Sequence, residues 1–365
     1  MGFRCGIVGL PNVGKSTIFN AMTSAGIESA NYPFCTIEPN VGMVPVKDPR
    51  LDRLSALAKT KKEVYAQMEF VDIAGLVAGA SKGEGLGNQF LAHIRQVDAI
   101  AHVIRCFEDS NIVHVSGNID PLRDREIINT ELMLADMDTV ARRIDKTAGR
   151  ARTGDKLSQV QMVTLEKLAK LLDEGKPARL LEVDETNRGL LKELCLLSAK
   201  PVLYVANVKE EDIITGNQWV DKLRQAVEAE EESPVVVISG AIEEELSKMP
   251  AEERQEFLAD MGMEESGLNR LVRAGYKLLH LITYFTVGEK ETRAWTIPLG
   301  TAAPQAAGVI HSDFEKGFIR AEVIAYDDYI ACGTEAAAKE KGLWRLEGKE
   351  YIVKDGDCMN FRFNV

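Results

Sequence analysis

Six short runs of apolar and β-branched residues recur along the chain, separated by stretches with helical spacing. The runs lie at residues 3–8, 41–46, 68–73, 99–106, 201–208 and 234–239. Apolar runs of this length that alternate with helices are typical of strands buried on both faces of a parallel sheet. The pattern predicts an α/β fold with a doubly wound, mostly parallel sheet. Ligand-binding loops in such sheets follow the carboxyl ends of the strands.

The stretch from residue 127 to 197 has no strand pattern and looks helical throughout. Its apolar residues recur every three or four positions, at Met137, Val140, Ile144 and Ala148, and then at Leu157, Val160, Thr164, Leu168 and Leu171. A break at residues 149–155 separates the two series. The spacing therefore predicts an inserted hairpin of two antiparallel helices.

The predicted turn of this hairpin is basic. Its charged residues are Arg142, Arg143, Lys146, Arg150, Arg152 and Lys156, against Asp145 and Asp155. Such a cluster is either a solvated tip or a binding site for a polyanion. The sequence leaves both open.

From about residue 282 the pattern changes to strands separated by turns. Candidate strands are 281–287, 293–299, 318–326 and 359–365, and residues 303–311 fit a short helix. We expect a small α+β domain at 281–365. It follows a nucleotide-binding domain at 1–280, which the helical insertion 127–197 interrupts.

Composition and charge narrow the classes of function. With 365 residues, 45% of them hydrophobic, the chain can build cores for two or three domains. Its net charge of −12 argues against binding polyanions by overall electrostatics, and we expect no DNA partner. The acidic runs 230–232 and 243–245 are expected to be solvated faces.

Cysteine usage and hydropathy bear on the compartment. The six cysteines show no C-x-x-C pair, which indicates a reduced, cytoplasmic protein without structural zinc. No apolar run reaches the roughly 18 residues of a membrane span, so no membrane partner is expected.

Residues 9–17, Gly-Leu-Pro-Asn-Val-Gly-Lys-Ser-Thr, match the phosphate-loop pattern G-x-x-x-x-G-K-[ST] without a gap. The match lies between a predicted strand and a predicted helix, as the motif requires. Gly9 and Gly14 let successive backbone N–H groups turn toward a phosphate. Lys15 should reach the β and γ phosphates, and Ser16 should ligate Mg²⁺.

Two further segments fit a nucleotide switch. Asp72, Ile73, Ala74 and Gly75 form a D-x-x-G sequence at the end of the third run. There Asp72 would hold Mg²⁺ through water, and the Gly75 N–H would contact the γ phosphate. Thr36, in the loop between these motifs, is a candidate second Mg²⁺ ligand.

Leu76 stands where many small GTPases carry the glutamine that orients the attacking water. Because an apolar side chain cannot do this, turnover is expected to be slow or to use another polar group. His114, in the loop after the fourth run, is the candidate substitute.

The segment Asn207-Val208-Lys209-Glu210 corresponds to the N-K-x-D motif that reads guanine. Its second position lacks lysine, and its last carboxylate is one methylene longer. A displaced carboxylate leaves buried polar groups unpaired, so the preference for guanine should be lost and adenine becomes the expected base. Residues 239–241, led by Ser239 and Gly240, can offer a backbone N–H to the base.

These motifs together resemble the YchF subfamily of Obg-like P-loop ATPases, which are Obg-related members of the TRAFAC class. The similarity extends over essentially all 365 residues and is carried by residues 9–17, 31–40, 72–88, 207–210 and 318–365. It implies an Obg-type G domain interrupted by a helical hairpin and followed by a β-grasp TGS domain. It also implies hydrolysis of ATP in preference to GTP, with Mg²⁺, and association with ribosomes.

The resemblance also implies roles for individual residues. The phosphate-binding residues would be Asn12, Val13, Gly14, Lys15, Ser16 and Thr17. Ser16 and Thr36 would bind Mg²⁺, and His114 would aid hydrolysis. Asn207, Val208 and the neighbouring backbone would contact adenine, and the hairpin and TGS domain would offer Arg142, Arg143, Arg150 and Arg152 to RNA.

Two other functions remain open from the residues. One is a conventional GTP switch in which Glu210 still accepts hydrogen bonds from guanine. The other is a nucleotide-gated scaffold whose C-terminal domain docks a stress-response protein. Asn12 also raises the possibility of K⁺ support at the phosphates.

Overall fold

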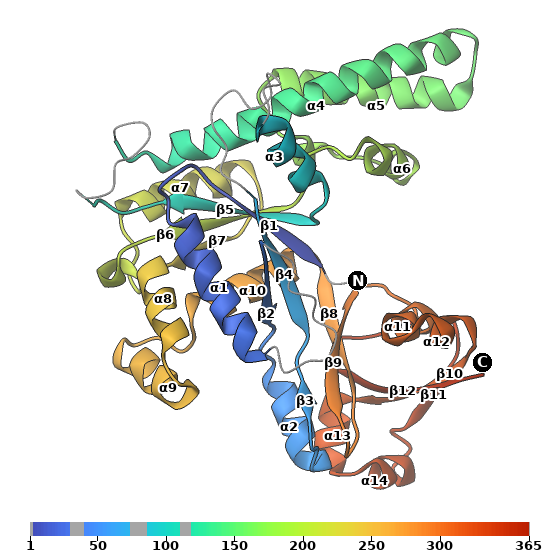
Figure 1. Ribbon diagram of the computed structural model, residues 1–365. Coiled ribbons are helices and arrows are strands. Elements are labelled where there is room, and N and C mark those ends of the chain that lie inside the picture. The colour runs from blue at the N-terminus through green and yellow to red at the C-terminus, as the bar shows by residue number, and fades with distance from the viewer. Residues whose placement is uncertain (1–2, 30–39, 74–85, 110–117, 365) are drawn as a thin grey trace. The chain divides into compact units, whose positions relative to one another are not determined.

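The computed structural model describes residues 3–29, 40–73, 86–109 and 118–364 (Figure 1). The chain folds into two compact units. The larger comprises residues 4–42 and 70–274, and the smaller comprises residues 1–3, 43–69 and 275–365.

The larger unit is built on a six-stranded sheet with the order β2-β4-β1-β5-β6-β7. The strands are β1 (Arg4–Val8), β2 (Val41–Pro45), β4 (Gln67–Asp72), β5 (Ala99–Arg105), β6 (Val202–Asn207) and β7 (Val235–Ile238). The pairs β1–β5, β5–β6 and β6–β7 are parallel, with Cys5 opposite Ala99 and Ile100 opposite Val202. All six predicted strands are present, so the predicted doubly wound α/β fold is confirmed.

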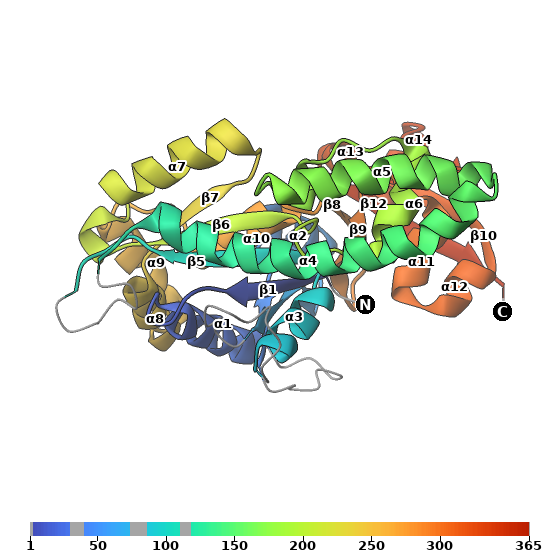
Figure 2. The same cartoon turned by 90° about the horizontal axis from the view of Figure 1, so that it is seen from above.

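Helices cover both faces of this sheet. In Figure 2, α4 (Pro121–Arg152) and α7 (Gln218–Glu230) lie on one face, whereas α1 (Lys15–Ser29), α3 (Leu86–Arg95) and α8 (Gly240–Lys248) lie on the other. The unit also contains α9 (Ala251–Asp260), most of α10 (Gly267–Leu278) and the short 3₁₀ helix η3 (Glu210–Asp212). Because β5 and β6 are buried along their whole length, their sequences are continuous apolar runs.

The predicted helical insertion consists of α4 (Pro121–Arg152) and α5 (Lys156–Asp173), followed by η2 (Ala178–Leu180) and α6 (Glu185–Leu194). Asp120 and Asp155 cap α4 and α5, accepting hydrogen bonds from the Leu122 and Ser158 N–H groups at 3.2 and 3.0 Å. A core of Met133, Val140, Leu165, Leu168 and Leu172, among others, joins the helices. Two of the apolar residues whose spacing predicted α5 do not belong to this core: Leu157 and Val160 are 57% and 44% exposed.

The smaller unit contains a second sheet with the order β11-β10-β12-β8-β9-β3. Its strands are β3 (Glu63–Val64), β8 (Leu281–Thr286), β9 (Thr292–Pro298), β10 (Phe318–Ala325), β11 (Arg345–Glu347) and β12 (Asp357–Phe363). β8 and β9 form an antiparallel hairpin, and β12 lies parallel to β8 and antiparallel to β10. A hairpin, a helix and a last strand placed beside the first form the β-grasp arrangement expected for the C-terminus.

Two cores stabilise the smaller unit. One packs α11 (Ala303–Ile310) against the sheet through residues such as Tyr284, Val323 and Phe361. The other includes Leu51 and Leu54 of α2 (Pro49–Ala58). The unit also contains α12 (Ser312–Lys316), α13 (Tyr326–Cys332) and α14 (Glu335–Glu340).

Residues 43–69 join this unit although they lie far from it in sequence. β3 pairs in parallel with β9, with Glu63 opposite Thr292, and Arg50 donates to Asp355 at 2.7 Å. The compact unit is therefore discontinuous, whereas the sequence pattern placed one boundary at residue 280. Within the described residues, no helix has the length and apolarity to cross a bilayer.

Candidate functional site

The phosphate-loop motif forms the connection between β1 and α1, as its pattern predicts. Gly14 has a φ of +90° and Asn12 a φ of +64°, both in the left-handed region. A Cβ at Gly14 would lie 2.1 Å from Nδ2 of Asn207, so only glycine fits there. At Gly9 a Cβ would lie 2.8 Å from the carbonyl oxygen of Val103.

The helix that follows starts at the residues predicted to hold phosphate and metal. α1 begins at Lys15, and the Ile18 N–H donates to the Gly14 carbonyl at 3.1 Å. No acidic side chain lies in its first turn, so nothing there offsets the positive end of the helix dipole. Ser16 is exposed, Thr17 is half-buried, and Val13 is buried and anchors the loop in the core.

Lys15 and Asp72 form an ion pair, with Nζ of Lys15 against Oδ1 of Asp72. Their side chains are 11% and 22% exposed, and Asp72 lies at the end of β4. The fold thus pairs the lysine predicted to bind phosphate with the carboxylate predicted to bind Mg²⁺, although the two lie 57 residues apart in the sequence. A triphosphate is more highly charged than Asp72, and Mg²⁺ is more highly charged than Lys15. Each side chain would therefore gain a stronger partner when a triphosphate and Mg²⁺ bind.

Asn207 holds the phosphate loop in place from the end of β6. Its Nδ2 donates to the Val13 carbonyl at 2.9 Å, and its Oδ1 accepts from the Gly240 N–H at 2.9 Å. The residue is 4% exposed. Asn207 was predicted as a base contact, but both ends of its amide bind backbone, so it is a positioning residue here and its contact with the base stays a prediction.

These elements surround a cavity of about 1100 Å³. Its lining includes most of the predicted nucleotide residues, namely Asn12, Gly14, Lys15, Ser16, Thr17, Asn207, Val208, Glu210, Ser239 and Gly240. It also includes residues that were not predicted to belong to the site, such as Phe107, Asp109, Glu211 and Glu244. The volume is ample for a nucleoside triphosphate, since pockets for small ligands usually enclose about 300–1,000 Å³.

The far end of the cavity is lined by the ends of β6 and β7. Val208 is buried, and its N–H donates to the Ile238 carbonyl at 2.8 Å. Glu210 is exposed at the start of η3. Ser239 is fully buried, and its hydroxyl has no hydrogen-bond partner among the described residues. An unpaired hydroxyl in a cavity wall offers a polar contact to a ligand.

A buried arginine shapes the end of β5 beside this cavity. Arg105 is 2% exposed, its Nε donates to the Phe107 carbonyl at 3.0 Å, and its guanidinium lies 4.6 Å from the centre of the Phe107 ring. This residue was not predicted from the sequence because it lies inside an apolar strand run. The one sequence feature that could have identified it is a charged residue at a position where the strand pattern requires an apolar side chain.

Three predicted site residues, Thr36, Gly75 and His114, lie outside the described residues, as does Leu76. Among the described residues, no group of three or more His, Cys, Asp or Glu could hold a metal ion by itself. The exposed Ser16 hydroxyl and the Asp72 carboxylate are oxygen ligands, which Mg²⁺ prefers, and Mg²⁺ commonly takes its other ligands from phosphate and water.

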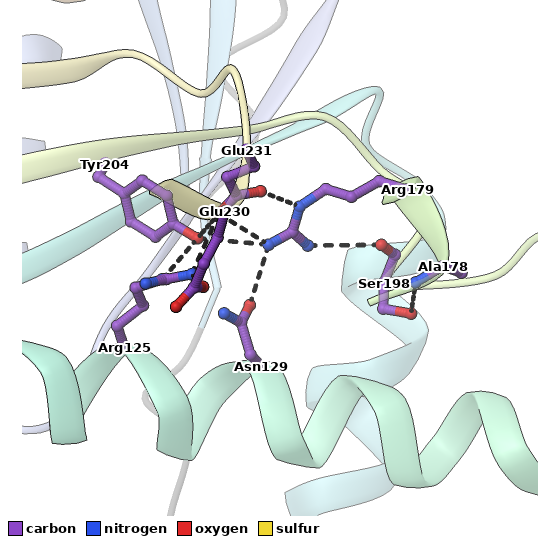
Figure 3. Close-up of polar contacts among 8 residues, drawn as sticks. All are labelled: Arg125, Asn129, Ala178, Arg179, Ser198, Tyr204, Glu230 and Glu231. Atoms are coloured by element: carbon purple, nitrogen blue, oxygen red, sulfur yellow. Dashed lines mark hydrogen bonds and ion pairs between the residues drawn. The ribbon is translucent and has the colours of Figure 1, made fainter. Parts of the chain in front are cut away.

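A second polar cluster lies between the insertion and the sheet (Figure 3). Arg179 donates to Glu231 at 2.5 Å and to Asn129 at 3.4 Å, and the Tyr204 hydroxyl donates to Glu231 at 2.6 Å. Arg125, on α4, donates to the Tyr204 hydroxyl at 3.2 Å and also binds Glu230. This network connects α4, η2, β6 and the end of α7.

Two acidic residues expected on solvated faces have buried side chains instead. Glu231 is in the cluster with a 3% exposed side chain; burial alone would raise the pKa of its carboxyl, but hydrogen bonding and the charge of Arg179 hold that pKa below its usual value. Glu243 is 2% exposed and accepts from the Gly267 N–H at 2.7 Å, and burial raises its pKa. The expectation was wrong at these positions because partners distant in sequence satisfy the carboxylates.

His102 lies on β5 beside this cluster, and its ring centre is 5.7 Å from that of Tyr204. It is 1% exposed, and burial, reinforced by the charges of Arg125 and Arg179, lowers its pKa to about 3. A histidine held neutral in the core does not exchange protons with a ligand near neutral pH.

Two protein families match separate parts of the chain. A family described as "50S ribosome-binding GTPase" matches residues 4–143. The family YchF-GTPase_C, described as a protein of unknown function (DUF933), matches residues 281–364.

Full-length relatives are also found. The chain is 58% identical to "Ribosome-binding ATPase YchF" of Pasteurella multocida over 366 residues, and 56% identical to the protein of the same name from Bacillus subtilis over 367 residues; each alignment covers 100% of both chains. Among solved structures, that of the Schizosaccharomyces pombe YchF GTPase matches with a TM-score of 0.90 and 39% identity, covering 99% of this chain and 98% of that one.

Proposed function

This chain belongs to the YchF family, and we propose that it is a Mg²⁺-dependent ATPase that associates with ribosomes. The observation that carries the proposal is the cavity between the phosphate loop and the ends of β6 and β7. Relatives alike over their full length are named ribosome-binding ATPases. Since ribosomes are cytoplasmic, that is the compartment we assign.

Different described residues would bind the phosphates and the Mg²⁺ of a triphosphate. The N–H groups at the start of α1 and the Lys15 ammonium would neutralise the phosphates, and Ser16 with Asp72 would hold Mg²⁺. When bound, Mg²⁺ supplies charge neutralisation to the phosphates in the transition state. The main contribution of the chain is positioning, since Asn207 fixes the loop before any ligand arrives.

The residues outside the described ranges keep the roles predicted for them. Thr36 would be a second Mg²⁺ ligand, the Gly75 N–H would contact the γ phosphate, and His114 would aid the attack of water in place of a glutamine. Replacing His114 with alanine should slow single turnover with little change in ATP affinity. An unchanged single-turnover rate would remove His114 from the mechanism.

Preference for ATP over GTP is the finer part of the proposal. The names of the relatives do not agree on the nucleotide: the bacterial proteins are called ATPases, whereas the yeast structure and the matching family are called GTPases. Guanine recognition needs a carboxylate that accepts from two adjacent donors. Glu210 is longer than the aspartate of that motif and lies exposed in η3, so the site should favour adenine.

A competition titration of ATP against GTP, with Mg²⁺ and a fluorescent nucleotide, tests this preference. The variant Glu210→Asp should raise GTP affinity relative to ATP, whereas Glu211→Asp, the matched control on the same turn, should not. Tighter binding of GTP by the unaltered chain would support the alternative of a conventional GTP switch. Loss of nucleotide binding in Lys15→Ala would confirm the site itself.

Ribosome association needs its own measurement. Cosedimentation with ribosomes should occur and should differ between a non-hydrolysable ATP analogue and ADP. Reversing the charges of Arg150 and Arg152 should weaken it if the hairpin tip contacts RNA. Arg143 is a poorer candidate, since it donates to Glu193 at 2.8 Å. Undiminished binding would leave a protein partner, including a stress-response protein, as the alternative.

K⁺ support of turnover is a further part of the proposal. Asn12 lines the phosphate end of the cavity, where a monovalent cation could add positive charge. Equal rates in K⁺ and Na⁺ would remove this role.

A further inference from the structure

The outer face of α5 carries exposed aliphatic side chains that have no role in the nucleotide site. Leu157, Val160 and Val163 are 57%, 44% and 53% exposed. They recur every three residues, so at about 100° per residue they lie within one sector of the helix. A neighbouring face of α5, centred about 110° from the stripe, is buried through Leu165, Leu168 and Leu172. The stripe is thus displayed on a helix that is already packed.

Lysines share this sector with the aliphatic residues. Lys156 and Lys167 are exposed, and helical spacing places each within about 40° of Val160. Neither forms a salt bridge within the part of the chain that the structure describes. The acidic residues of α5, Glu166 and Asp173, fall outside the sector by the same spacing. Along the helix axis, the three aliphatic residues therefore lie between two lysines, one at each end of the stripe.

The combination decides between classes of partner. RNA could pair with the lysines but would gain little by covering Leu157, Val160 and Val163, because nucleotide recognition uses aromatic and guanidinium platforms rather than aliphatic ones. An anionic bilayer usually recruits aromatic residues and a wide apolar face, and the net charge of −12 opposes its approach. A protein helix that carries an apolar stripe with carboxylates near both ends complements both features.

We propose that the face formed by Lys156, Leu157, Val160, Val163 and Lys167, here called the α5 face, docks an acidic amphipathic helix of a partner protein. Charge complementarity selects this occupant, since carboxylates at the two ends of an apolar stripe would meet Lys156 and Lys167. Between the two lysines α5 rises about 16 Å, which matches about three turns of a docked helix. The small area makes the contact weak and transient, with a dissociation constant of about 10–100 µM.

A synthetic peptide tests the face with the full-length chain. The probe is a helical peptide of about three heptads with leucine at positions a and d and glutamate at e and g. Fluorescence anisotropy measures its binding. Hydrogen exchange should show added protection of the α5 amides when the peptide binds. Absence of binding at about 1 mM peptide would overturn the proposal.

Two sets of substitutions separate the apolar contribution from the charged one. The triple variant Leu157→Gln, Val160→Gln and Val163→Gln should weaken binding at least about tenfold at every salt concentration. The double variant Lys156→Gln and Lys167→Gln should weaken it several-fold at low salt and remove most of the salt dependence. The matched control, Leu134→Gln with Lys146→Gln, changes exposed residues of α4 and should bind like the unaltered chain.

Other outcomes would assign the face differently and overturn the proposal. Equal binding by the triple variant would place the peptide elsewhere. Displacement of the peptide by single-stranded RNA or by phosphatidylglycerol vesicles, at lower concentration than by unlabelled peptide, would indicate a polyanion or membrane site. Self-association that the triple variant abolishes in sedimentation equilibrium would assign the face to a second copy. None of these measurements requires ribosomes or nucleotide, so each is independent of the proposed ATPase activity.

Discussion

Replacing Asn207 with alanine should destabilise the chain and weaken nucleotide binding together. The substitution removes the partners of the Val13 carbonyl and the Gly240 N–H, each bonded at 2.9 Å in a buried position. Leaving one buried backbone group unpaired costs about 1–3 kcal/mol, and two are left unpaired, so we expect the free energy of unfolding to fall by about 2–6 kcal/mol. If about 2 kcal/mol of this reflects a disordered phosphate loop, the dissociation constant for ATP should rise roughly 30-fold.

The assay pairs urea denaturation with titration of a fluorescent ATP analogue. Asn207→Asp supplies a second perturbation: it keeps an acceptor for the Gly240 N–H but places an oxygen against the Val13 carbonyl. Its affinity should be at least as low as that of the alanine variant. Asp136→Ala is the matched control, because Asp136 also accepts buried backbone bonds, from Leu197 and Ser198 at 2.8 Å. The reasoning is refuted if Asn207→Ala loses stability yet binds ATP with unchanged affinity, as the control should.

Three further predictions use the same site and the buried cluster. Gly14→Ala should abolish detectable ATP binding in the same titration, because its Cβ would lie 2.1 Å from Asn207 Nδ2 and its φ of +90° is strained for alanine. Lys15→Met should lower ATP affinity at least about 100-fold with little loss of stability, and a loss below about threefold would contradict phosphate contact. Glu231→Gln should lower the free energy of unfolding at pH 7. Because the folded pKa of Glu231 is depressed, its stabilisation is present above the unfolded pKa of about 4.3 and lost as pH falls through the folded value, so urea curves of variant and unaltered chain should converge in acid.

The strands of the larger sheet could be predicted because a strand buried on both faces needs apolar residues at nearly every position, which gives an unbroken apolar run in the sequence. β5 and β6 show this most clearly. β3 and β11 were not predicted, since strands of two and three residues leave almost no pattern. The pairing of β3 with β9 joins segments more than 200 residues apart, and no local pattern records it. This is why the discontinuous unit was missed.

The phosphate loop was predictable for a related reason. Its glycines are demanded by backbone conformation and close approach at fixed spacing, so the chemistry is local in sequence. The buried cluster is the opposite case. Arg125, Arg179 and Glu231 come from three distant segments, and each looks like an ordinary surface charge in its own context. Only the fold shows that they neutralise one another.

The two sites share one structural member, β6. Near its end, the Asn207 amide holds the phosphate loop and the start of α8, and three residues earlier the Tyr204 hydroxyl binds Arg125 of α4 and Glu231. Because side chains alternate along a strand, these residues lie on opposite faces of the sheet. The first turns of α4 and the phosphate loop are therefore both hydrogen-bonded to the same buried strand. A partner that contacts the hairpin therefore contacts an element bonded to β6, the strand that positions the phosphate loop, although the hairpin residues of this cluster do not line the nucleotide cavity.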